Sequence, residues 1–60
     1  MGKWKMVIIH TGNGTSYKHY RGLSTWGKPI DGVETGDELF EMDTGKAFMF
    51  DSETPKWWPL

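Results

Sequence analysis

Residues 38–51, ELFEMDTGKAFMFD, place two aromatic-rich runs on either side of a short polar turn. The turn residues Asp43, Thr44 and Gly45 fit a three-residue β-hairpin loop, in which a type I turn is followed by a glycine in the left-handed region. Such a loop fixes the register of the two strands. The expected opposite pairs are Met42 with Lys46, Phe40 with Phe48, and Glu38 with Phe50.

Both faces of this hairpin are largely apolar. Because side chains alternate across a strand, we expect one face to hold Phe40, Met42, Phe48 and Phe50, and the other to hold Leu39, Ala47 and Met49 beside Glu41. The rest of so short a chain can cover one of these faces. The other face then meets another molecule or remains as an exposed apolar patch.

The sequence around the hairpin predicts further strands and one long connector. Residues 5–11 are apolar and β-branched, and residues 16–21 alternate, with Tyr17 and His19 sharing one face. A glycine turn at residues 12–15 separates them. Residues 22–36 carry four glycines and one proline, which predicts an extended connector anchored by Trp26 and Ile30. Residues 57–60 form a short edge segment, where Pro59 ends the pairing.

These elements predict an all-β fold with one small domain over residues 1–60. We expect a small antiparallel meander of three to five strands with a long irregular connector. The position of the first two strands relative to the hairpin stays open: they pair in the same sheet or extend the sheet of a neighbouring subunit.

Composition limits the core and the class of function. A 60-residue chain buries only about 60% of its unfolded surface, and this one has no cysteine for disulfides and four Trp, three Phe, two Tyr and four Met for packing. A net charge of −1 argues against a nucleic-acid-binding protein. No run approaches the length of a membrane span, and the apolar run at residues 6–9 is too short for a signal peptide.

Candidate chemical sites each have a simpler explanation. His10 and His19 could pair as metal ligands, but two ligands do not make a structural zinc site. The hairpin carboxylates could act as acid and base, yet Asp43 fits a turn-forming role and Glu41 fits a solvent-facing pair with Lys46. Residues 17–21 interleave aromatic and basic side chains as nucleic-acid-binding strands do. We therefore predict no catalytic residues, no metal and no cofactor.

Residues 22–58 resemble small uncharacterised proteins encoded in the structural gene clusters of tailed bacteriophages and prophages. The resemblance rests on residues 22–25 (GLST), on Lys28 and Pro29, on the run 36–51 (GDELFEMDTGKAFMFD), and on Trp57. Phe48 stands where the family more often has Tyr. The resemblance implies a virion or assembly component and brings no catalytic residues with it.

We therefore expect a non-enzymatic phage or prophage structural protein, for example a capsid-decorating, head–tail-connecting or tail accessory subunit. It would be assembled into the virion in the host cytoplasm and would bind virion proteins or copies of itself. The expected contact residues are Trp26, Leu39, Met49, Trp57 and Trp58, and the hairpin edge or face is the expected site of symmetric self-association. The alternative is a carbohydrate- or receptor-binding module that uses exposed Trp side chains.

Overall fold

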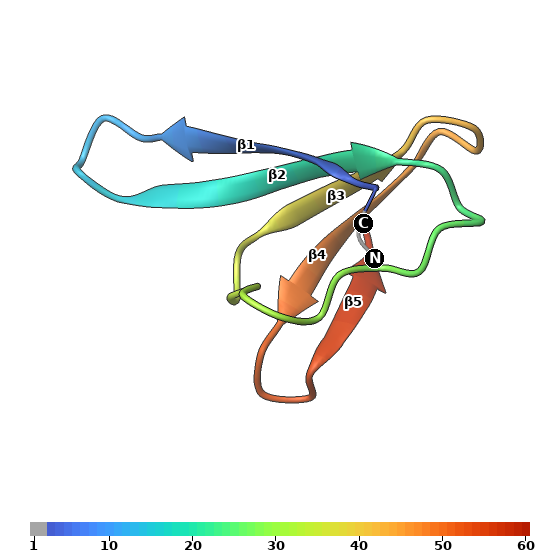
Figure 1. Cartoon of the computed structure of the whole chain (residues 1–60). Coiled ribbons are helices and arrows are strands. Elements are labelled where there is room, and N and C mark those ends of the chain that lie inside the picture. Colours follow the sequence, from blue (N-terminus) through green and yellow to red (C-terminus); the bar gives the residue numbers. More distant parts are fainter. Residues whose placement is uncertain (1–2) are drawn as a thin grey trace.

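The computed structural model describes residues 3–60 and shows one five-stranded sheet with the strands in chain order (Figure 1). The strands are β1 (Lys5–His10), β2 (Ser16–Gly22), β3 (Glu38–Glu41), β4 (Lys46–Asp51) and β5 (Lys56–Pro59). The prediction of an all-β fold is confirmed. The first two strands belong to the same sheet as the hairpin, which settles the position that the sequence left open.

One pair of neighbouring strands is parallel. β1–β2, β3–β4 and β4–β5 are antiparallel, whereas β2 and β3 run in the same direction with His19 opposite Glu38. Neighbouring parallel strands need a long crossover, and residues 23–37 supply it. β3 spans only the end of β2, from His19 to Gly22, so the other end of the β1–β2 hairpin projects beyond the sheet as an arm (Figure 1).

The predicted register of the β3–β4 hairpin is wrong by one residue. Its loop has four residues, Met42 to Gly45, and is closed by a hydrogen bond from the N–H of Gly45 to the carbonyl of Glu41 at 2.8 Å. The first loop residue, Met42, donates its N–H to the carbonyl of Gly22 in β2 at 2.7 Å. Gly45 has the positive φ that the sequence predicted, at 76°. The shift changes which side chains are opposite: Leu39 faces Phe48, Phe40 faces Ala47, and Glu41 faces Lys46.

The shifted register separates a covered face of the sheet from an open one. The covered inner face carries the core, formed by Tyr20, Leu39, Phe50 and Trp57, with Trp4, Val33 and Phe48 packed against it. Edge-to-face contacts of Trp57 with Tyr20 and Phe50 fill its centre. The expectation that one hairpin face is covered by the chain itself is confirmed, although the members of that face differ.

The connector closes the inner face and is held there by two indole groups. Trp57 donates from Nε1 to the carbonyl of Pro29 at 2.8 Å, and Trp4 donates to the carbonyl of Gly27 at 2.7 Å. Trp26 packs edge-on against Trp4, so its predicted anchoring role is confirmed. Ile30 is not an anchor, because 74% of it is exposed. Val33 packs against the core in its place.

Candidate protein-binding face

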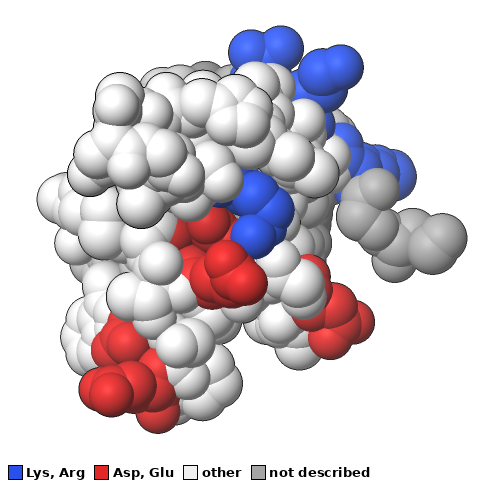
Figure 2. Space-filling view, turned by 90° about the vertical axis from the view of Figure 1, so that its left-hand side faces the viewer, with Lys and Arg blue, Asp and Glu red and all other residues white. Residues whose placement is uncertain are grey.

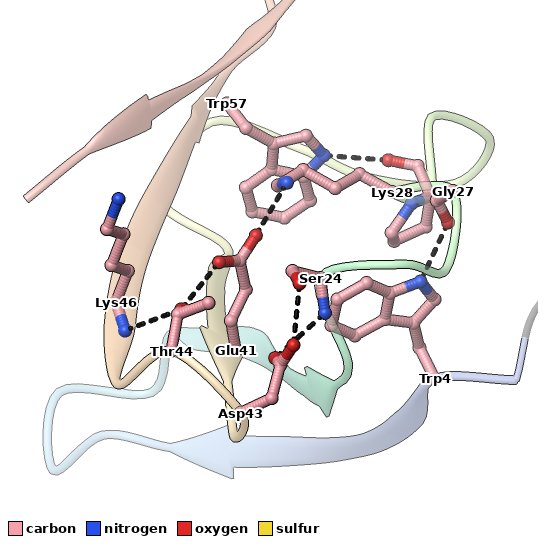
Figure 3. Close-up of polar contacts among 10 residues, drawn as sticks. Trp4, Ser24, Gly27, Lys28, Glu41, Asp43, Thr44, Lys46 and Trp57 are labelled. Carbon is pink, nitrogen blue, oxygen red and sulfur yellow. Dashed lines mark hydrogen bonds and ion pairs between the residues drawn. The ribbon is translucent and has the colours of Figure 1, made fainter.

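The carboxylates of the hairpin hold the connector and do not form an acid–base pair. Asp43 accepts the backbone N–H of Ser24 at 2.9 Å and its hydroxyl at 2.6 Å, where the sequence predicted a bond within the turn (Figure 3). These contacts from Ser24 lower the pKa of Asp43. A short polar side chain therefore ties the β3–β4 loop to the start of the connector.

Glu41 is buried on the inner face. It lies opposite Lys46 in the register, but the prediction that the two form a solvent-facing pair is wrong. The Glu41 carboxylate lies 2.8 Å from the ammonium of Lys28 and accepts the hydroxyl of Thr44 at 2.7 Å (Figure 3). These two hydrogen bonds lower its pKa. Lys28 also lies 4.7 Å from the centre of the Phe48 ring. The pair therefore holds the middle of the connector over the core.

Asp37 is a buried carboxylate that the sequence interpretation did not single out. It accepts the backbone N–H groups of Lys18 and Glu34, at 2.9 and 2.8 Å, and lies 2.9 Å from the Lys18 ammonium. Burial alone would raise its pKa, but these hydrogen bonds and the ammonium outweigh it, so the pKa of Asp37 is lowered. Asp37 directly follows Gly36, which adopts positive φ. In the sequence, an acidic residue next to a glycine turn was the signal that could have indicated a carboxylate bound to backbone N–H groups.

The opposite side of the sheet is an uncovered, largely apolar outer face. The register places one residue from each strand in a row across it: Val7, His19, Glu38, Met49 and Trp58. Side chains on that side are partly or largely exposed, including Val7 at 39%, Phe40 at 36% and Trp58 at 44%. We call this the outer face, and its apolar members are Val7, Ile9, Tyr17, Phe40, Ala47, Met49 and Trp58.

Charged residues occupy both ends of the outer face. Lys5 lies opposite Arg21 at one end, and Asp51 lies opposite Lys56 at the other. Lys56 covers one side of the Trp58 ring at 4.1 Å from its centre. In the middle, His19 and Glu38 approach to 3.8 Å. The outer face therefore has apolar side chains on both sides of one polar pair and charged residues at its two ends, a mixed surface of the kind found at protein–protein contacts.

The structure divides four of the five predicted contact residues between the two faces of the sheet and places the fifth, Trp26, on the connector. Met49 and Trp58 lie on the outer face, as a contact role requires. Leu39 and Trp57 are in the core at 0% and 8% exposure, so their predicted role in binding a partner is wrong. The predicted outcome for adjacent tryptophans, one sealing the core and one facing outward, is confirmed by Trp57 and Trp58. Trp26 is half-buried on the connector.

The edge of the β3–β4 hairpin is not available for self-association, because β2 and β5 pair with its two outer sides. The tryptophans also do not line up as a sugar-stacking platform, since Trp57 is internal and Trp26 packs on Trp4.

The two histidines are not neighbours in the sheet, because His10 lies opposite Ser16 and His19 lies opposite Val7. Among residues 3–60, no three potential metal ligands cluster, and no helix is long and apolar enough to span a membrane.

The near-neutral net charge conceals a strong separation of charge along the chain. All eight acidic residues lie after residue 30, and five of the seven Lys and Arg residues lie before it. On the face that Figure 2 shows, most of the cations lie toward the upper right, whereas carboxylates lie at the centre, beside one cation, and toward the bottom. Two cations from the first half, Lys18 and Lys28, are paired with carboxylates of the second half. The sequence interpretation missed this separation because it considered only the total.

Comparison with known proteins gives no relative for this arrangement. No protein-family profile matches the chain, and no curated protein or solved structure matches it either.

Proposed function

We propose that this protein is a small structural or assembly subunit, and that it works by binding another protein surface through the outer face of its sheet. The observation that carries the proposal is the exposure of Val7, Phe40 and Trp58 on one side of the sheet, while the other side buries its aromatic residues. A chain that hides Leu39 completely yet leaves Trp58 open has a face suited to a partner.

The composition of the outer face favours a protein partner over a sugar or a nucleic acid. Aromatic residues and methionine are enriched in protein interfaces, and Trp is prominent among their energetic hot spots. Trp58 is the tryptophan that faces outward on a strand, and Lys56 already covers one side of its ring. Lys5 and Arg21 would suit acidic side chains at the rim of a partner.

The resemblance of residues 22–58 to proteins from phage and prophage structural clusters supports a virion as the setting. Within that setting, the proposed role is capsid decoration, head–tail connection or a tail accessory position. The protein would bind without turnover, and its contribution would be to bury apolar surface on a larger virion protein or on copies of itself.

Mass spectrometry of purified phage particles tests this function. We expect the chain in particles from hosts that carry its gene, in a fixed ratio to the major capsid or tail protein. The variants Trp58→Glu and Met49→Glu each replace an apolar side chain of the outer face by a carboxylate and should remove the chain from the particles. Ile30→Glu is the matched control, because Ile30 is an exposed apolar residue on the connector.

Three results would contradict the proposal. The first is a chain that is absent from particles while it is expressed in the host. The second is retention of both outer-face variants at the wild-type ratio. The third is an equal loss of the Ile30→Glu control, which would show that the outer face has no special role. Circular dichroism of each purified variant shows that loss from particles does not reflect unfolding.

A further inference from the structure

The two edge strands of the sheet differ in how well they can accept another strand. Within residues 3–60, β1 pairs only with β2, and β5 pairs only with β4. β5 has four residues and includes Pro59, which has no N–H to donate. β1 has six residues, contains no proline, and is exposed at five of its six positions. Natural proteins usually protect such an edge with prolines, bulges or charges, and β1 carries only Lys5 at its end.

The hydrogen bonds of the β1–β2 hairpin show which groups of β1 point outward. Thr11 donates its N–H to the carbonyl of Thr15 at 2.9 Å, so Thr11 faces β2. Backbone groups alternate along an antiparallel strand, so those of Lys5, Val7 and Ile9 face β2 as well. The N–H and C=O groups of Met6, Ile8 and His10 therefore point away from β2. The bond from the N–H of Lys18 to Asp37 on the far side of β2 agrees with this alternation.

A second copy of β1 fits this edge in an antiparallel register centred on Ile8. Ile8 then lies opposite the partner's Ile8, and Val7 lies opposite the partner's Ile9 on each side of the two-fold axis. At the ends, Lys5 meets the partner's Thr11, and Met6 meets the partner's His10. Each outward-facing N–H of β1 then donates to an outward-facing C=O of the partner's β1. In this register no Lys lies opposite a Lys. A register centred on Val7 would instead place Lys5 against the partner's Ile9.

We infer that β1 is the strand through which two copies of this chain join into one continuous sheet. The two-fold axis of such a pair is perpendicular to the sheet, so the inner and outer faces of both copies stay on the same sides. Two five-stranded sheets become one of ten strands, and the two outer faces form one larger apolar surface. The inference concerns an edge of the sheet and stands apart from the proposed use of the outer face.

Light scattering after size exclusion, combined with a charge swap at Ile8, tests the inference. The wild-type chain is expected at twice its 6.9 kDa mass at high micromolar concentration. Ile8→Lys places two like charges opposite each other at the axis, so it should be monomeric, and Ile8→Glu should be monomeric for the same reason. Mixing the two variants should restore a 1:1 dimer. Ile30→Lys, at an exposed position on the connector, should remain dimeric.

Engineered cysteines test the register in a chain that has none of its own. Val7 and the partner's Ile9 form a non-hydrogen-bonded pair, whose Cα atoms lie about 4.5 Å apart, within the range of a disulfide. A mixture of Val7→Cys and Ile9→Cys should form a mixed disulfide under mild oxidation, whereas Val7→Cys alone should remain uncrosslinked. This experiment also decides the question if a charged variant at Ile8 fails to fold.

A monomeric wild-type chain would overturn the inference and leave the edge to a strand from a different protein. A dimer that survives Ile8→Lys, or a Lys and Glu mixture that remains monomeric, would overturn it as well. Crosslinking of Val7→Cys with itself would show a register centred on Val7 and would refute the one described above.

Discussion

Asp37 binds both the backbone and the side chain of Lys18, with its two carboxylate oxygens 2.9 Å from the Lys18 N–H and 2.9 Å from its ammonium. Lys18 lies in β2 one residue before the point where the pairing with β3 begins. The Asp37 carboxylate thus takes the place of a β3 backbone carbonyl and satisfies an N–H that would otherwise be unpaired. This contact joins the β1–β2 arm to the start of β3.

Replacing Asp37 by Asn should destabilise the protein by about 1–3 kcal/mol, because the amide cannot satisfy both buried N–H groups and no longer pairs with Lys18. Urea unfolding followed by tryptophan fluorescence measures the change, and hydrogen exchange at the Lys18 amide should accelerate. Asp31→Asn is the control, because Asp31 is exposed. Equal stability of the two variants would contradict the structural role of Asp37.

Gly22→Ala should destabilise the fold because there is no space for a methyl group. A Cβ at this position would lie 2.5 Å from a ring carbon of Trp4 and 2.7 Å from one of Trp26. Overpacking of this kind costs about 1–3 kcal/mol, and the tryptophan emission should change as the rings separate. Gly27→Ala is the matched control, since a Cβ there meets no atom within 4 Å. A neutral Gly22→Ala would show that the two indoles do not close over this glycine.

Leu39→Ala should unfold much of the population at room temperature. Leu39 is completely buried at the centre of the core, and removing a buried Leu side chain costs about 2–5 kcal/mol, comparable with the whole stability expected for so small a domain. Leu60→Ala is the control, because 74% of Leu60 is exposed and its contact with the sheet is a backbone bond to Ala47. Thermal melts that shift equally in both variants would be inconsistent with the core as described.

Stability should fall at both extremes of pH. The pKa values of Asp37, Glu41 and Asp43 are lowered from ordinary values of 3.8, 4.5 and 3.8. Their contribution is therefore present above those values and is lost as the pH falls through the folded-state pKa. The hydrogen bond to Asp37 raises the pKa of Lys18 above 10.5, and burial raises the pKa of Tyr20 above 10.0. Their contribution is present below those values and is lost as the pH rises further.

Urea midpoints measured across the pH range test this expectation. They should be nearly constant between the acidic and alkaline limits and should decrease beyond each. Asp37→Asn should show a smaller decrease in acid than the wild type. A urea midpoint that stays constant or increases as the pH falls below 4 would contradict the assigned carboxylate contacts.

Much of the fold follows from local sequence signals. Alternation in residues 16–21 correctly placed Tyr17 and His19 on one face, and Gly45 correctly marked the left-handed turn position. The hairpin at residues 38–51 was predicted because both of its strands and its turn are encoded locally. The register was missed because Met42 bonds to Gly22, and nothing near the turn reports the position of β2.

Contacts between distant segments explain the other errors. Leu39 and Met49 are both apolar residues of one hairpin, and only the placement of Tyr20 and Trp57 decides that Leu39 faces the core. Glu41 was assigned to Lys46 because they are neighbours across the turn, whereas its partner Lys28 lies on the connector, 13 residues away. A glycine-rich connector has no periodicity, so its contacts could not be predicted from pattern.

The parallel contact between β2 and β3 has a consequence for how the chain assembles. Each antiparallel pair joins neighbouring segments, but this contact joins residues 19 positions apart, such as His19 and Glu38. The chain therefore consists of two halves, one rich in cations and one rich in carboxylates. They meet along the β2–β3 contact and through bonds from the connector, such as Lys28 with Glu41 and Trp57 with Pro29. A protease cut near residue 31 should yield two fragments that reassociate without covalent linkage, more weakly as salt increases.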